Sequence, residues 1–129
     1  MKMEYFKYSE FDCNCCGANS GKENMDVEFL EMIDEARSYA RIPFHISSGF
    51  RCKDKNQDLI DKGYAASKTS SHLIGKAADI ACTNSKDRAL IIGSLLEAGF
   101  MRIGISGKQN FIHVDNDVEN KVFPVIWLY

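Results

Sequence analysis

The segment KAADIAC, at residues 76–82, restricts the fold more than any other part of the sequence. Side chains alternate between the two faces of a β-strand, so its odd-numbered residues, including Asp79, share one face and its even-numbered residues, including Ile80, share the other. Small or apolar residues dominate both faces, which is typical of a strand buried between two layers. The fold therefore needs packing elements on both sides of this strand, and a carboxylate at its centre needs a partner.

Helices of suitable length are predicted before and after this strand. Apolar residues recur at helical spacing in residues 26–41, with Asp26 as the expected N-cap. Another helix is expected to begin at Ser85 and to end at Gly99 in a left-handed conformation. A weaker helix is expected from about residue 53 to residue 62.

The remaining apolar segments predict short strands. PFHISS reads as one strand, and FMRIGIS and FIHVDN read as a hairpin joined by the turn GKQN. FPVIWLY is expected to be a strand or a packed tail. The order of helices and strands predicts an α+β domain, and a length of 129 residues fits one domain, at residues 1–129, which we expect to be monomeric.

Composition excludes several partners. The formal net charge is -2 and no run of Lys or Arg is long enough to follow a phosphate backbone, so we expect no nucleic-acid partner. No segment has the apolar length of a membrane span, and the first residues have no apolar run of signal-peptide length. The chain is therefore expected to be made in the cytoplasm and to act elsewhere only if it is released.

Five cysteines in such a chain are expected to be free thiols or metal ligands, because a reducing compartment disfavours disulfides. Cys13, Cys15 and Cys16 are crowded together, whereas Cys52 and Cys82 lie elsewhere. Adjacent Cys15 and Cys16 do not follow the usual Cys-x-x-Cys spacing of zinc knuckles. Buried thiols or a redox-dependent cross-link are the expectation here, and a structural zinc site is the alternative.

Two histidines are candidates to share a site with Asp79. His113 lies at the centre of its predicted strand, and His72 lies in the loop that precedes the Asp79 strand, where Gly75 allows a sharp change of direction. Two histidines and one carboxylate form the three-ligand set of a catalytic zinc, which leaves a fourth position for water or substrate. The alternative is that each histidine is an ordinary hydrogen-bonded residue of the core.

The ordered motifs SSGFRC, SSHLIGKAAD and FIHVD resemble those of the zinc D-alanyl-D-alanine carboxypeptidase and endolysin peptidase family. SSGFRC and FIHVD stand where that family carries its arginine motif and its last metal histidine, and the opening YSEFDCNCCG resembles the start of its small members. The resemblance spans nearly the whole chain. SSHLIGKAAD fits the pattern Ser-x-His-x-x-Gly-x-Ala-x-Asp through Ser70, His72, Gly75, Ala77 and Asp79.

The resemblance implies a peptidase that acts on the peptide stems or cross-links of bacterial peptidoglycan, with a hedgehog-like α+β fold and a small antiparallel sheet flanked by helices. His72, Asp79 and His113 would be the zinc ligands, and the metal would polarise the scissile carbonyl and acidify a water. Arg51 would bind substrate and stabilise either the developing oxyanion or a terminal carboxylate. Ser70 would contact substrate.

One position departs from the family pattern. Many relatives carry an Asp or Glu as general base three residues before the last histidine, where this chain has Asn110. Asp115 could act as the base, hydrogen-bond a ligand histidine, or be purely structural. His45 is expected to be a core or surface imidazole, not a catalytic one.

Several functions remain open at this stage. A phage-type lysin that reaches the wall through a lysis pore fits the chain, and so does an enzyme released by another route. Either carboxypeptidase or endopeptidase action is compatible with the sequence. A zinc-binding wall or phage structural module without activity is the main alternative, motivated by Asn110. A small-molecule amidase or dipeptidase with the same metal chemistry is a third.

Overall fold

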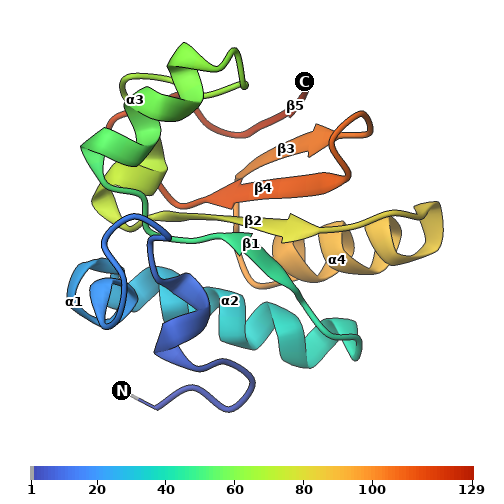
Figure 1. Cartoon of the computed structure of the whole chain (residues 1–129). Helices are drawn as coiled ribbons and strands as arrows, with labels where there is room; N and C mark the ends of the chain where they lie inside the picture. The colour runs from blue at the N-terminus through green and yellow to red at the C-terminus, as the bar shows by residue number, and fades with distance from the viewer. Residues whose placement is uncertain (1) are drawn as a thin grey trace.

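A five-stranded sheet in the order β1-β2-β4-β3-β5 forms the centre of the computed structural model, which describes residues 2–129 (Figure 1). Neighbouring strands from β1 to β3 pair antiparallel. The last strand pairs parallel to β3, so the expected antiparallel sheet has one parallel edge. The chain reverses direction after β4, so β5 runs in the same direction as β3. The strands are β1 Ile46–Ser48, β2 Ala77–Ala81, β3 Arg102–Ser106, β4 Phe111–Asp115 and β5 Val125–Leu128.

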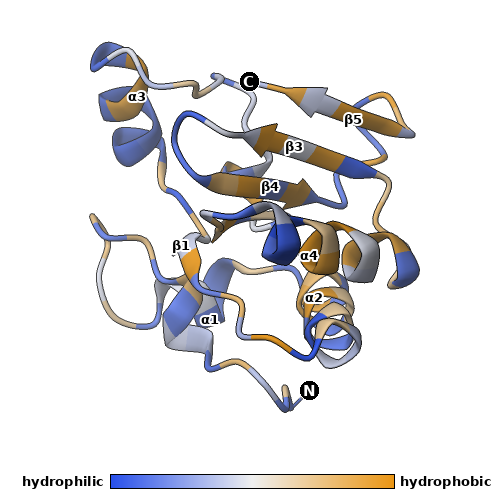
Figure 2. Ribbon diagram, turned by 90° about the vertical axis from the view of Figure 1, so that its right-hand side faces the viewer, coloured by the Kyte–Doolittle hydropathy of each residue, from blue (hydrophilic) through white to orange (hydrophobic). Residues whose placement is uncertain are grey.

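Two long helices, α2 (Val27–Ala40) and α4 (Ser85–Glu97), cover one face of the sheet (Figure 1). Their buried side chains, such as Phe29 and Leu95, join those of Ile80 and Ile112 in one hydrophobic core. Figure 2 shows hydrophobic residues concentrated in these strands and helices. The shorter α3 (Lys53–Asp61) lies at the other side of the sheet (Figure 1). None of the described helices has the length and apolar character needed to cross a membrane.

The predicted helix ends are confirmed with one difference. The carboxylate of Asp26 accepts a hydrogen bond from the Phe29 N–H at 3.0 Å, as expected of an N-cap. The N-cap of α4 is Asn84 and not Ser85, because the Asn84 side chain accepts from the Asp87 N–H at 2.8 Å. Gly99 follows α4 with a φ of +100°, which is the predicted left-handed conformation.

Three short elements were not predicted, because each is too short to show helical periodicity. They are η1 (Tyr8–Phe11), α1 (Ser20–Asn24) and η2 (Ser71–Ile74). Gly75 ends η2 with a φ of +70°, and a Cβ atom there would lie 1.9 Å from the Asn24 carbonyl oxygen. Glycine at this position therefore allows the loop before β2 to pack closely against α1.

Both faces of β2 are buried, as the alternation in KAADIAC predicted, but only one of them faces the hydrophobic core. Ala78 and Ile80 belong to the core shared with α2 and α4. Ala77 and Asp79 lie on the other face and are also buried. Polar side chains of β2 and β4 are thereby gathered on the side of the sheet that the long helices leave uncovered.

Candidate metal centre and active site

His72, Asp79 and His113 come together on this polar face of the sheet, as the sequence predicted. Asp79 in β2 lies directly opposite His113 in β4 in the antiparallel register. His72 is brought to the same place by η2, whose N-cap Ser70 accepts a hydrogen bond from the His72 N–H at 3.2 Å. One potential ligand atom from each of the three residues lies within 4.8 Å of the other two.

The hydrogen bonds around His72 define which ring nitrogen is available to a metal. Its Nδ1 lies 2.8 Å from the Gly49 carbonyl oxygen, which can only accept, so Nδ1 carries the proton. The lone pair on Nε2 then points toward Asp79, whose Oδ1 is 3.3 Å away. An unprotonated nitrogen facing a carboxylate oxygen needs a cation or a proton between them.

His113 faces the carboxylate of Asp79 with Nδ1, whereas His72 faces it with Nε2. The Nδ1 atom of His113 is 3.1 Å from Oδ1 of Asp79, and its Nε2 is 2.7 Å from Oδ2 of Asp115. If Nε2 donates to Asp115, the lone pair of Nδ1 faces Asp79, as the lone pair of His72 Nε2 does. Two imidazole nitrogens and one carboxylate oxygen fit a zinc ion with one coordination position left for water or substrate.

Asp115 is completely engaged by its neighbours. Its side chain is buried, and besides His113 it accepts hydrogen bonds from Arg102 Nε at 2.7 Å and from the Asp117 N–H at 3.1 Å. Such a carboxylate is placed to orient His113 and has no oxygen free of these contacts. Of the three roles that the sequence left open for Asp115, this geometry favours hydrogen bonding to the candidate ligand.

Asn110, at the position of the family base, lies in the turn between β3 and β4. It is exposed, has a φ of +56°, and its carbonyl oxygen accepts from the Cys82 N–H at 2.9 Å. It does not line the cavity that contains the candidate ligands. Among the described residues, the carboxylates that line this cavity are Asp79 and Asp115.

Arg51 lies beside the candidate ligands and is buried. Its guanidinium is 3.8 Å from Oδ2 of Asp79 and donates to Ser48 Oγ at 3.2 Å and to Asn56 Oδ1 at 3.1 Å. Burial lowers the pKa of Arg51, which the charge of Asp79 opposes. The buried Asn56 was not identified from the sequence, where no motif or periodicity distinguishes it from the other polar residues of α3.

A cavity of about 370 Å³ opens over the candidate ligands. Trp127 forms part of its wall, and its ring lies against Gly104, where a Cβ atom would be 2.6 Å from the indole. The ring centroids of Trp127 and His113 are 5.4 Å apart.

The predicted Ser70 also lines the cavity, whereas exposed His45 does not. The other lining residues that bear on binding are Arg51, Arg102, Lys121, Tyr64 and Tyr129.

Burial and mutual contacts set the charges of the three candidate ligands. Burial lowers the pKa of His72, which Asp79 opposes. Burial alone would raise the pKa of Asp79, but His72 and His113 outweigh it and hold that pKa below its ordinary value. Burial likewise disfavours the imidazolium of His113, yet hydrogen bonds to Asp115 and Asp79 raise its pKa.

The raised pKa of His113 predicts that, as pH rises, the metal-free fold loses stability while the affinity for zinc increases. In the metal-free protein, the imidazolium stabilises the fold fully below the unfolded pKa of about 6.5, and this contribution is lost as pH rises through the higher folded pKa. Zinc needs the same nitrogen unprotonated, so its affinity should increase over that range. We expect the rise in melting temperature on adding zinc to be larger at about pH 8 than at about pH 5.5. An equal rise at both pH values would contradict this assignment of His113.

Comparisons with known proteins identify the family and the fold of this chain. The family model described as Peptidase M15 matches residues 4–115. The solved structure of the L-Ala D-Glu endopeptidase ChiX of Serratia marcescens has the same fold, with a TM-score of 0.61 and 18% sequence identity over 95% of this chain and 96% of that chain. The comparison with curated protein sequences finds no match. Because the family model matches most of the length of this chain, the chain belongs to the Peptidase M15 family.

Proposed function

We propose that this protein is a zinc-dependent peptidase that hydrolyses peptide bonds in the stems or cross-links of bacterial peptidoglycan. The observation that carries the proposal is the convergence of His72 Nε2, Asp79 Oδ1 and His113 Nδ1 in the wall of a cavity. Membership of a peptidase family supports hydrolysis of a peptide bond. Zinc, when bound, would act as a Lewis acid toward the scissile carbonyl and would lower the pKa of water.

The surrounding side chains have separate tasks in this proposal. Arg51, held by Ser48 and Asn56, would bind the substrate carbonyl or a carboxylate and stabilise the negative charge that develops on oxygen. Asp115 would keep the proton of His113 on Nε2, so that Nδ1 stays available to the metal. Ser70 would contact the substrate backbone from the cavity wall.

The charges of the cavity fit an acidic peptide. Arg51 and Lys121 line it, and the carboxylates of Asp79 and Asp115 are already engaged by His72 and by Arg102. Peptidoglycan stems carry carboxylates, which guanidinium and ammonium groups would bind. The structural neighbour is named an L-Ala D-Glu endopeptidase, which makes a bond within the stem one candidate. Removal of the terminal D-alanine and cleavage of a cross-link are the others.

Digestion of purified peptidoglycan by the zinc-loaded protein tests the proposal, with mass spectrometry of the products. We expect soluble fragments whose masses identify the cleaved bond: free D-alanine for a carboxypeptidase, separated stems for a cross-link endopeptidase, or stems cut after L-alanine. If this protein acts as a phage-type lysin, the same digestion should also lower the turbidity of a cell-wall suspension. Absence of any product from the zinc-loaded protein would contradict peptidase activity.

A zinc-binding wall module without activity is the second candidate, and the position of Asn110 favours it. That residue lies outside the cavity, and within residues 2–129 the cavity is lined by no carboxylate other than Asp79 and Asp115. Zinc-loaded protein that sediments with peptidoglycan but releases no product would support the module. Release of products would exclude it.

Substitution of Arg51 by lysine tests the role of the guanidinium. Lysine keeps the positive charge but loses the planar fork that contacts Ser48 and Asn56. We expect kcat/KM to fall by about 10²-fold, the usual cost of losing one oxyanion donor, while the zinc content is unchanged. Arg88→Lys, on α4, is the matched control and should retain wild-type kinetics. Wild-type kcat/KM in Arg51→Lys would exclude this role.

A further inference from the structure

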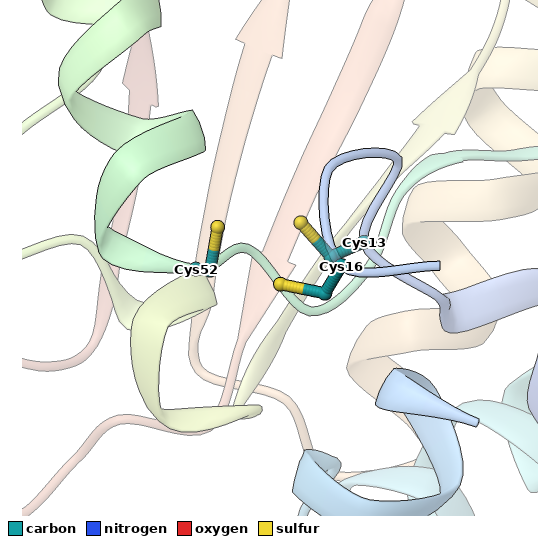
Figure 3. Close-up of side chains that lie close together, drawn as sticks. All are labelled: Cys13, Cys16 and Cys52. Atoms are coloured by element: carbon teal, nitrogen blue, oxygen red, sulfur yellow. The ribbon is translucent and has the colours of Figure 1, made fainter. Parts of the chain in front are cut away.

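Three cysteines converge on one point outside the cavity of the candidate active site. Cys13 and Cys16 come from the loop between η1 and α1, and Cys52 immediately precedes α3 (Figure 3). Their sulfur atoms all lie within 4.8 Å of one another, and all three are free thiols. They are brought together although almost forty residues of sequence separate the loop from Cys52, so the arrangement depends on the tertiary fold.

The loop has the local form of a metal-binding turn. Cys13 and Cys16 are separated by two residues, which is the knuckle spacing of structural zinc sites. The adjacent pair Cys15 and Cys16 lacks this spacing, but the pair Cys13 and Cys16 has it. Gly17 closes the turn with a φ of +76°, and its N–H donates to the Cys13 carbonyl oxygen at 3.0 Å.

Cys52 faces this turn from the start of a helix. It is the N-cap of α3, and its sulfur accepts a hydrogen bond from the Lys55 N–H at 3.4 Å. Helix N-termini stabilise thiolates, which are the form of cysteine that binds metals. Figure 3 shows the side chain of Cys16 directed toward Cys52.

The sulfur of Cys13 is also surrounded by backbone donors. Burial raises its pKa, but backbone N–H groups of Cys52, Cys16 and Cys15 outweigh burial and lower the pKa to about 7. Contacts with Cys52 and Cys13, together with desolvation, raise the pKa of Cys16 to about 12. Several thiolates this close together repel one another, and a bound cation removes that repulsion.

We propose that Cys13, Cys16 and Cys52 bind a second, structural Zn²⁺ ion, with Cys15 as the fourth ligand. Thiolates are the usual ligands of structural zinc sites, which are tetrahedral and closed. Cys15 belongs to the same turn and is exposed, and Cys52 raises the pKa of its thiol. Its sulfur is not one of the three that lie within 4.8 Å of one another. The fifth cysteine, Cys82, follows β2 and takes no part.

This centre would connect the N-terminal loop to the residue next to Arg51. Phe11 and Phe50 already link the two segments through a backbone hydrogen bond of 2.9 Å. A metal bound to Cys52 would add a second link and hold the start of α3 in place. The centre is separate from His72, Asp79 and His113, so its existence does not depend on the proposed peptidase activity.

Zinc content of purified, dialysed protein tests the proposal. We expect two zinc ions per wild-type chain, one in His113→Ala, one in Cys16→Ser/Cys52→Ser, and none in the combined variant. Cys82→Ala is the matched control and should retain two. Circular dichroism of each variant reports whether it folds. One zinc ion in the wild type that is retained in Cys16→Ser/Cys52→Ser would overturn the second site.

Two readouts identify the ligands without depending on activity. Cobalt bound to His113→Ala should show a thiolate-to-cobalt charge-transfer band, which Cys15→Ser weakens or shifts and Cys82→Ala leaves unchanged. In the wild type, zinc should protect Cys13, Cys15, Cys16 and Cys52 from alkylation until a chelator is added. Alkylation of these thiols in zinc-loaded protein, or a disulfide among them, would contradict the proposal. A failed digestion of peptidoglycan would leave these results unaffected.

Discussion

Replacement of His113 by alanine is expected to lower kcat/KM on peptidoglycan stem peptides by about 10³-fold or more. His113 Nδ1 is one of three candidate ligand atoms, and its loss would leave His72 and Asp79 to hold the metal. A catalytic metal contributes several kcal/mol to transition-state stabilisation, and each 1.4 kcal/mol corresponds to about tenfold in rate. The measurement is product release by mass spectrometry, together with the zinc content.

His45→Ala is the matched control for this variant, because His45 is exposed and lies outside the cavity. It should retain wild-type activity and zinc. Activity of His113→Ala comparable to that of the wild type would refute the assignment of the metal centre, whichever bond the enzyme cleaves.

Replacement of Asp115 by asparagine is expected to reduce both zinc affinity and stability. The amide would donate to Nε2 of His113 and so move the imidazole proton to Nδ1, the candidate metal-binding atom. Loss of such a hydrogen-bonded partner typically lowers metal affinity by about 10- to 100-fold. The substitution also leaves Arg102 buried without its ion pair, which should cost about 3 to 5 kcal/mol of unfolding free energy.

Zinc competition titrations and urea unfolding of the metal-free protein measure the two effects of Asp115→Asn separately. Glu119→Gln removes the same charge from an exposed position and should change neither. The folded-state pKa of Asp115 is lowered, because His113, Asp117 and Arg102 outweigh its burial. Its stabilising effect is therefore present above the unfolded pKa and lost as pH falls through the folded value. Unchanged zinc affinity in Asp115→Asn would make Asp115 a purely structural acid.

Much of the fold was predictable from local patterns. Helical spacing in α2 and α4 and alternation in β2 and β4 depend only on which face of each element is buried. The parallel pairing of β5 was not predictable, because strand pairing depends on the path of the chain after β4. The short η1, α1 and η2 are held by contacts with distant segments, such as the hydrogen bond between Phe50 N–H and the Phe11 carbonyl oxygen.

The residues of the candidate site were likewise only partly predictable from the sequence. His72, Asp79, His113 and Arg51 were found from motif spacing and from the family resemblance. Trp127 and Asn56 were not, because neither belongs to a motif. Trp127 lies at the cavity because β5 pairs with β3 and because Gly104 has no side chain that would collide with the indole ring.

By itself, the sequence determined which residues could bind a metal and which face of each strand they would occupy, because ligand type and strand alternation are local properties. Only the tertiary structure decided that Asp115 is occupied by Arg102 and His113, that Asn110 lies outside the cavity, and that Cys52 meets the loop of Cys13 and Cys16. These relations join residues far apart in the chain, and strand register and loop packing bring them together.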